Sequence, residues 1–125
     1  MKKSELLGQL EHAYGRLQDA LRIPLEQELA IDGTIQRFEF TFELTWKTLK
    51  VYLEDQGISS YSPKTCLKEA FKIGWIKDEE GWLTLLQARN MTSHVYNEHM
   101  AMDIYKEIKK YHNLIHSIMH VLKDQ

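Results

Sequence analysis

Three side chains that could act on a phosphate ester lie within eight residues of one another. Arg89 carries a rigid fork of donors that matches phosphate oxygens, and His94 can exchange a proton near neutral pH. The hydroxyl of Tyr96 can act as a nucleophile or accept a transferred group. No other stretch combines three such groups so closely. These residues therefore form the candidate site, with Asn90 and Asn97 as supporting polar residues.

The spacing of these residues leaves two interpretations open. On a continuous helix Arg89 and Tyr96 share a face, whereas His94 lies roughly 140° around the axis from Arg89. A break after Ser93 would turn His94 back toward Arg89. The alternative is purely structural, with a surface arginine, a histidine that caps a helix and a half-buried tyrosine. Short motifs often match by chance, so spacing alone does not decide between them.

The stretches on either side have the pattern of α-helices. Alternating β-branched residues are nearly absent, and two prolines and six glycines separate runs with apolar residues three and four positions apart. This pattern predicts an all-α protein of one domain, residues 1–125, built as an antiparallel four-helix-type bundle with one extra short helix. The predicted helices run over residues 4–22, 34–55, 63 to about 74, 78 into the candidate site, and 97 to about 122.

The second predicted helix is the most apolar. The sequence Asp32-Gly33-Thr34 is a turn and capping signal before it, and Gly57 is a natural stop after it. Phe40 and Trp46 widen its apolar stripe, so we expect it to pack against several neighbours or against a second chain. The stripe itself consists of Ile35, Phe38, Phe42, Thr45, Leu49 and Tyr52.

The ends of the later helices also carry signals. Ser62 and Pro63 are typical of a cap and a first helical turn. Most residues from 92 to 97 are modest helix formers, so we expect the fourth helix to break around His94–Asn97 and Asn97 to cap the last helix. That last helix should continue to about residue 122. Its apolar seam consists of Ile104, Ile108, Tyr111, Ile115, Ile118 and Leu122.

A second candidate is the carboxylate pair Glu39 and Glu43 on the aromatic helix. Paired carboxylates can carry out acid–base chemistry or hold a metal. However, no Glu-x-x-His sequence occurs, which disfavours a di-iron bundle. We favour a structural role, in which these glutamates pair with neighbours such as Lys47 or Arg37, and a contact with a partner is the alternative.

Other residue types are better explained by packing or solvation. His112, His116 and His120 lie one helical turn apart and could bind a transition metal, but no carboxylate or cysteine lies beside them. We interpret them as a polar helix face and Cys66 as a small buried group. We therefore expect no metal and no cofactor. Solvated faces are also predicted for two sets of lysines, Lys64, Lys68 and Lys72, and Lys106, Lys109 and Lys110.

Composition narrows the class of protein further. The net charge of −2 and pI of about 6.3 argue against sequence-independent coating of nucleic acid, although a small phosphate site is compatible with them. One cysteine, an early charged N-terminus and no apolar run of roughly 20 residues predict a cytoplasmic protein without an internal disulfide or a membrane span.

With these residues in view, the sequence resembles a known family. Arg89-x4-His94-x-Tyr96 is similar to the Arg-x(4–6)-His-x-Tyr signature of HEPN-domain (higher eukaryotes and prokaryotes nucleotide-binding) proteins of the HepT type. The segments 32–47 and 89–98 resemble the branch called nucleotidyltransferase substrate-binding proteins. The resemblance spans nearly the whole chain in the expected order.

The resemblance implies a helical bundle that forms homodimers through helical faces and works with a minimal nucleotidyltransferase. In HepT-type members the two proteins form a toxin–antitoxin system, in which the helical protein cleaves RNA and the nucleotidyltransferase silences it by adding AMP to the motif tyrosine. Carried over by position, Arg89 and His94 would be the pair of a metal-independent ribonuclease, and Tyr96 would be the nucleotide acceptor. RNA or a nucleotide would then be a further partner.

Overall fold

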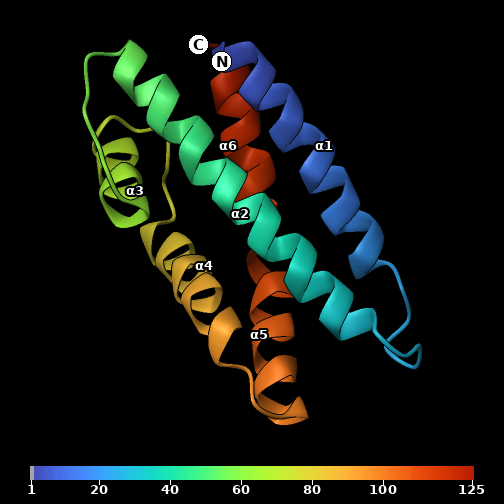
Figure 1. The fold of residues 1–125 in the computed structure, drawn as a ribbon. Helices are drawn as coiled ribbons and strands as arrows, with labels where there is room; N and C mark the ends of the chain where they lie inside the picture. The colour runs from blue at the N-terminus through green and yellow to red at the C-terminus, as the bar shows by residue number, and fades with distance from the viewer. Residues whose placement is uncertain (1) are drawn as a thin grey trace.

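The structure is a computed structural model and describes residues 2–125. Over this range it contains helices and no strand, so the all-α prediction is confirmed. Long helices run side by side in a bundle, and the two chain ends lie together at one end of it (Figure 1). The elements are α1 (Lys3–Leu21), α2 (Ala30–Asp55), α3 (Pro63–Lys72), α4 (Glu79–Met91), a 3₁₀ turn (Thr92–His94), α5 (Glu98–Tyr111) and α6 (Asn113–Lys123).

Several helix boundaries lie where the sequence predicts them. The Ser62 hydroxyl accepts a hydrogen bond from the Thr65 N–H at 3.2 Å, with Pro63 in the first turn of α3. Asp78 caps α4 by accepting from the Gly81 N–H at 2.9 Å. After α2, Gly57 takes a left-handed backbone conformation with φ 79°, which ends the helix.

The predicted start of α2 is wrong by one turn. The helix begins at Ala30 rather than Thr34, so Asp32 and Gly33 lie inside it and are not a turn before it. Leu29 ends the preceding loop with φ 73°, and its carbonyl accepts from the Gly33 N–H at 2.8 Å. Asp32 thus lies in the first helical turn, where a carboxylate is stabilised by the positive end of the helix dipole.

The predicted single last helix is also wrong, because it is interrupted at His112. The Ile115 N–H bonds the His112 carbonyl at 3.0 Å, a three-residue step that tightens the turn between α5 and α6. The His112 ring lies half-buried, and its Nδ1 is 3.0 Å from the Tyr14 hydroxyl of α1. The apolar seam nevertheless continues across the interruption, since Ile108 and Ile115 are both fully buried.

The core is organised around α2, which packs against α1, α3, α4, α5 and α6. Phe38 and Phe42 are fully buried, and the ring of Phe42 lies 6.5 Å from that of Trp82 on α4. Phe40 differs from them, because the residue is 62% exposed. The prediction that this helix packs against several neighbours is therefore confirmed, but Phe40, which the sequence predicts to widen its apolar stripe, faces solvent.

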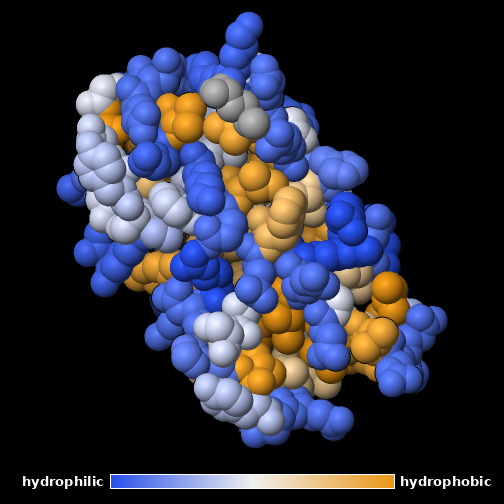
Figure 2. All heavy atoms as spheres, viewed as in Figure 1, coloured by the Kyte–Doolittle hydropathy of each residue, from blue (hydrophilic) through white to orange (hydrophobic). Residues whose placement is uncertain are grey.

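The face of the bundle seen in Figure 2 is mostly polar. In Figure 2, hydrophilic residues cover most of the visible face, and hydrophobic residues appear in separate groups between them. None of the helices described over residues 2–125 is long and apolar enough to cross a membrane.

Candidate functional site

The candidate site lies on the connection between α4 and α5. The α-helix ends at Met91, a 3₁₀ turn carries the chain through His94, and Val95 is extended. The break predicted for this region is confirmed, although regular α-helix ends three residues before His94. Asn97 caps α5 as predicted, because its side-chain oxygen accepts from the Met100 N–H at 2.9 Å.

His94 and Tyr96 lie together on this connection. The Nδ1 atom of His94 is 3.3 Å from the Tyr96 hydroxyl, and the two rings meet edge to face with centroids 6.4 Å apart. Both side chains are exposed, Tyr96 by 78%. The tyrosine is therefore not the half-buried residue of the structural alternative. Instead, an accessible phenol lies within reach of an imidazole that can take its proton.

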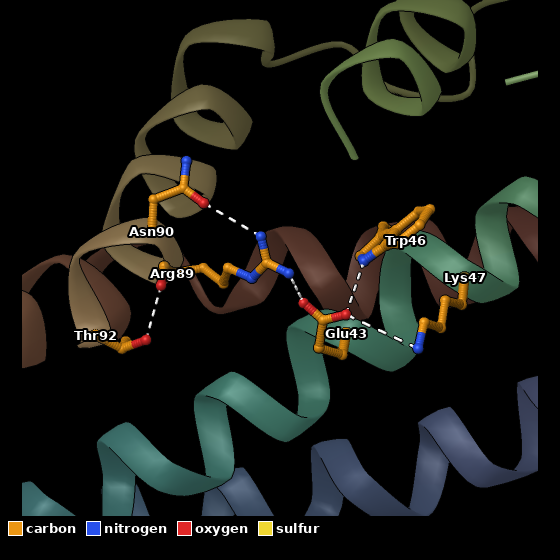
Figure 3. A network of polar contacts seen from close by, with 6 residues as sticks. All are labelled: Glu43, Trp46, Lys47, Arg89, Asn90 and Thr92. Carbon is orange, nitrogen blue, oxygen red and sulfur yellow. Dashed lines mark hydrogen bonds and ion pairs between the residues drawn. The ribbon is translucent and has the colours of Figure 1, made fainter. Parts of the chain in front are cut away.

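Arg89 points toward α2 rather than toward the imidazole and phenol. Its Nη2 donates to Oε1 of Glu43, and its Nη1 donates to the side-chain oxygen of Asn90 at 3.2 Å (Figure 3). The Arg89 side chain is 29% exposed and that of Glu43 34%. An ion pair thus joins α4 to α2, and the guanidinium remains partly accessible to solvent.

The carboxylate of Glu43 joins three donors. Its Oε2 accepts from the indole Nε1 of Trp46 at 3.1 Å and lies 4.0 Å from Nζ of Lys47 (Figure 3). The predicted pairing of Glu43 with Lys47 is confirmed, whereas the sequence does not predict the Arg89 contact. Arg37 does not pair with a glutamate, because its Nη1 donates to the Arg16 carbonyl at 2.8 Å.

The three motif side chains consequently form two pairs within one chain. One pair is His94 with Tyr96, and the other is Arg89 with Glu43. Among the polar contacts of the described residues, none joins Arg89 to His94 or to Tyr96. Within a single chain, the Arg89 guanidinium and the His94 imidazole thus contact different partners.

Comparison with known proteins decides the family. The sequence model of the family described as "nucleotidyltransferase substrate binding protein like" matches residues 5–124. The chain belongs to this family. The resemblance carried by the Arg89, His94 and Tyr96 motif and by the aromatic helix is thereby confirmed.

Solved structures of similar proteins have the same fold as this nucleotidyltransferase substrate-binding family member. A crystal structure from Thermus thermophilus aligns with a TM-score of 0.84 at 32% identity, covering 90% of this chain and 98% of the other. A structure from Haemophilus influenzae aligns with a TM-score of 0.79 at 28% identity, covering 94% and 98%. The latter is described as the fold of a substrate binding domain of a nucleotidyltransferase.

A curated relative carries a different description. The probable ribonuclease HepT of Haemophilus influenzae is 38% identical over 87 residues, which cover 66% of this chain and 60% of that protein. The match therefore spans less than two thirds of the relative. Both descriptions used in the family, substrate binding and ribonuclease, are thus found among proteins similar to this chain.

The other residues considered from the sequence make packing or solvent contacts. Cys66 is buried as predicted, its Sγ lies 2.7 Å from the Ser60 hydroxyl, and burial raises the pKa of its thiol. His112 binds Tyr14, and burial lowers the pKa of its imidazole. Over residues 2–125, no three His, Cys, Asp or Glu side chains are grouped to hold a metal ion. The lysines of both predicted solvated sets are largely accessible to solvent.

Proposed function

We propose that this chain is the helical substrate-binding and regulatory partner of a minimal nucleotidyltransferase, and that Tyr96 accepts AMP from that enzyme. One observation carries the proposal: the phenol is 78% exposed, and its hydroxyl lies 3.3 Å from Nδ1 of His94. Family membership and the substrate-binding-domain fold support the identity of the partner. The pair would act as a HepT-like toxin–antitoxin system in the cytoplasm.

The transfer that we propose balances as an ordinary nucleophilic substitution. The phenol oxygen of Tyr96 attacks the α-phosphorus of ATP, and the new phosphorus–oxygen bond forms as the bond to pyrophosphate breaks. The phenolic proton passes to Nδ1 of His94, which must be the unprotonated ring nitrogen. Asn97 supports this arrangement because its cap fixes the start of α5 directly after Tyr96.

The test is an adenylylation assay read by intact mass. The protein is incubated with a minimal nucleotidyltransferase of the same genome, Mg²⁺ and ATP, and the expected result is a mass gain of whole adenylyl groups. Tyr96→Phe should abolish the gain. Tyr61→Phe is the matched control, because Tyr61 is 81% exposed but contacts Lys50 rather than a histidine. An equal gain on Tyr96→Phe would exclude Tyr96 as the acceptor.

A second function, a metal-independent ribonuclease, is favoured by the similarity to the probable ribonuclease HepT. In this proposal His94 takes the proton of a ribose 2′-hydroxyl or protonates the leaving oxygen. Arg89 stabilises the charge that develops on the phosphate. A homodimer would supply a second His94, so that one imidazole acts as base and the other as acid.

The ribonuclease proposal is tested by cleavage of RNA in the presence of a chelator. Wild-type protein should cleave, and His94→Ala should not. Cleavage that persists in both Arg89→Ala and His94→Ala would remove the proposal. Exposed His120→Ala on α6 is the matched control, since it removes an imidazole far along the sequence from the site and should leave cleavage unchanged.

A further inference from the structure

Three donors from two helices converge on one carboxylate that belongs to the chain itself. Arg89 of α4 donates to Oε1 of Glu43, whereas Oε2 accepts from Trp46 at 3.1 Å and faces Lys47 at 4.0 Å. Figure 3 shows the guanidinium, the indole N–H and the ammonium all directed at this carboxylate. The Glu43 carboxylate is thus surrounded by two cations, Arg89 and Lys47, and by one neutral donor, Trp46.

The same donors suit a phosphate at least as well as a carboxylate. A guanidinium binds either anion through parallel N–H donors, and an ammonium binds phosphate as a point charge. Arg89 and Lys47 carry two positive charges against the single negative charge of Glu43. The group is open to solvent, since 29% of the Arg89 side chain and 59% of the Lys47 side chain are exposed. An anion from solution can therefore reach it.

We propose that Arg89, Trp46 and Lys47 form a binding site for the phosphate of a nucleotide, and that Glu43 is an internal anion competing for it. The Glu43 carboxylate occupies the donors in the free protein, and a nucleotide phosphate displaces it on binding. Glu43 then sets the affinity of the site and restrains Arg89 until a phosphate arrives. This site requires no modification of Tyr96, so it goes beyond the function proposed above.

A purely structural ion pair would behave differently when the charge of Glu43 is removed. A structural clamp predicts that Arg89 loses its orientation and that phosphate binding stays the same or weakens. Competition predicts the opposite, because a nucleotide phosphate no longer has to displace a carboxylate. Glu43→Gln separates the two, since the amide keeps the size of the side chain and one acceptor oxygen while losing the charge.

The probe is 5′-AMP, with adenosine as the ligand that lacks the phosphate, titrated by calorimetry. We expect Glu43→Gln to bind AMP about tenfold more tightly than wild type, which corresponds to about 1.4 kcal/mol and is close to the interaction of two charges about 4 Å apart in water. Adenosine should not respond to the substitution. Glu39→Gln is the matched control, because it removes the same charge from an exposed position one helical turn before Glu43. It should change the affinity for AMP less than about twofold.

A second readout follows the site directly. The indole N–H resonance of Trp46, assigned through Trp46→Phe, should shift when AMP is added, whereas that of buried Trp82 should not. Lys47→Gln, at a largely exposed position, should weaken AMP binding severalfold without unfolding the protein. Tyr61→Phe, at an exposed position outside the site, should bind AMP as wild type does.

Three results would overturn the proposal. The first is AMP binding by folded Glu43→Gln that is no tighter than by wild type. The second is a gain in affinity that persists when Arg89→Gln is added to Glu43→Gln. The third is unchanged AMP binding in Lys47→Gln, which would mean that the ammonium takes no part in the site.

Discussion

Arg89 and Glu43 lie 46 residues apart in the sequence, yet the guanidinium of one donates directly to the carboxylate of the other. This ion pair ties the last turn of α4 to the middle of α2. It holds the arginine of the motif away from His94 and Tyr96, which contact each other instead. The candidate site therefore has two parts, the Arg89–Glu43 ion pair between α4 and α2 and the His94–Tyr96 pair on the connection that follows α4.

The stability carried by this pair should be modest. Both side chains are about a third exposed, so solvent weakens their attraction, and a double-mutant cycle of Glu43→Ala and Arg89→Ala should give a coupling energy of about 0.5–1 kcal/mol. The measurement is urea unfolding of the four proteins. Strictly additive effects would mean that the two side chains do not interact in solution.

The cap of α5 should matter for both stability and adenylylation. Asn97→Ala removes the acceptor for the Met100 N–H and should cost about 1 kcal/mol of unfolding free energy. It should also slow AMP transfer, because Tyr96 directly precedes the cap. Asn97→Asp retains a capping oxygen and should restore both properties. If Asn97→Ala unfolds at the same denaturant concentration as wild type, the cap contributes nothing to the stability of the protein.

Stability should fall in acid through His112. Burial lowers the pKa of its imidazole from 6.5, so the unfolded chain binds a proton more readily than the folded one. The contribution of neutral His112 is therefore present above pH 6.5 and is lost as the pH falls below that value. His112→Gln should flatten this dependence, whereas exposed His116→Gln should not. Unfolding midpoints measured between about pH 5 and 8 test the difference.

Substitutions at two phenylalanines of α2 should differ strongly in their effect on stability. Phe42 is fully buried, so Phe42→Ala should destabilise the protein by about 3–5 kcal/mol. Phe40 is 62% exposed, so Phe40→Ser should leave the unfolding free energy of the isolated chain nearly unchanged. If the homodimer that the family resemblance implies uses this side of α2, Phe40→Ser should shift the protein toward monomer in sedimentation experiments. An equal loss of unfolding free energy in Phe42→Ala and Phe40→Ser would contradict the difference in burial between the two residues.

Much of the fold could be predicted from local signals. The cap at Ser62, the stop at Gly57 and the cap at Asn97 depend on side chains and backbone preferences within a few residues, and all three lie where the sequence puts them. The start of α2 could not be read in this way, since a glycine inside a helix and a leucine with positive φ both run against local preference.

The interruption at His112 and the contact between Arg89 and Glu43 could not be predicted for a different reason. Each involves a partner from another helix, since the His112 ring contacts Tyr14 and Arg89 contacts Glu43. Periodicity reports which face of a helix is apolar but not which residues meet across helices. Nothing in the local sequence around Glu43 indicates that Arg89 is its partner.

The proposed transfer of AMP to the exposed phenol beside His94 can be measured at the level of the single residue. The most direct measurement is peptide mapping by tandem mass spectrometry after incubation with the nucleotidyltransferase and ATP. We expect an adenylyl group on the peptide that contains Tyr96, strongly reduced in His94→Ala and unchanged in Tyr61→Phe. An unmodified Tyr96 in a protein that gains AMP elsewhere, or that gains none while the enzyme is active, would contradict it.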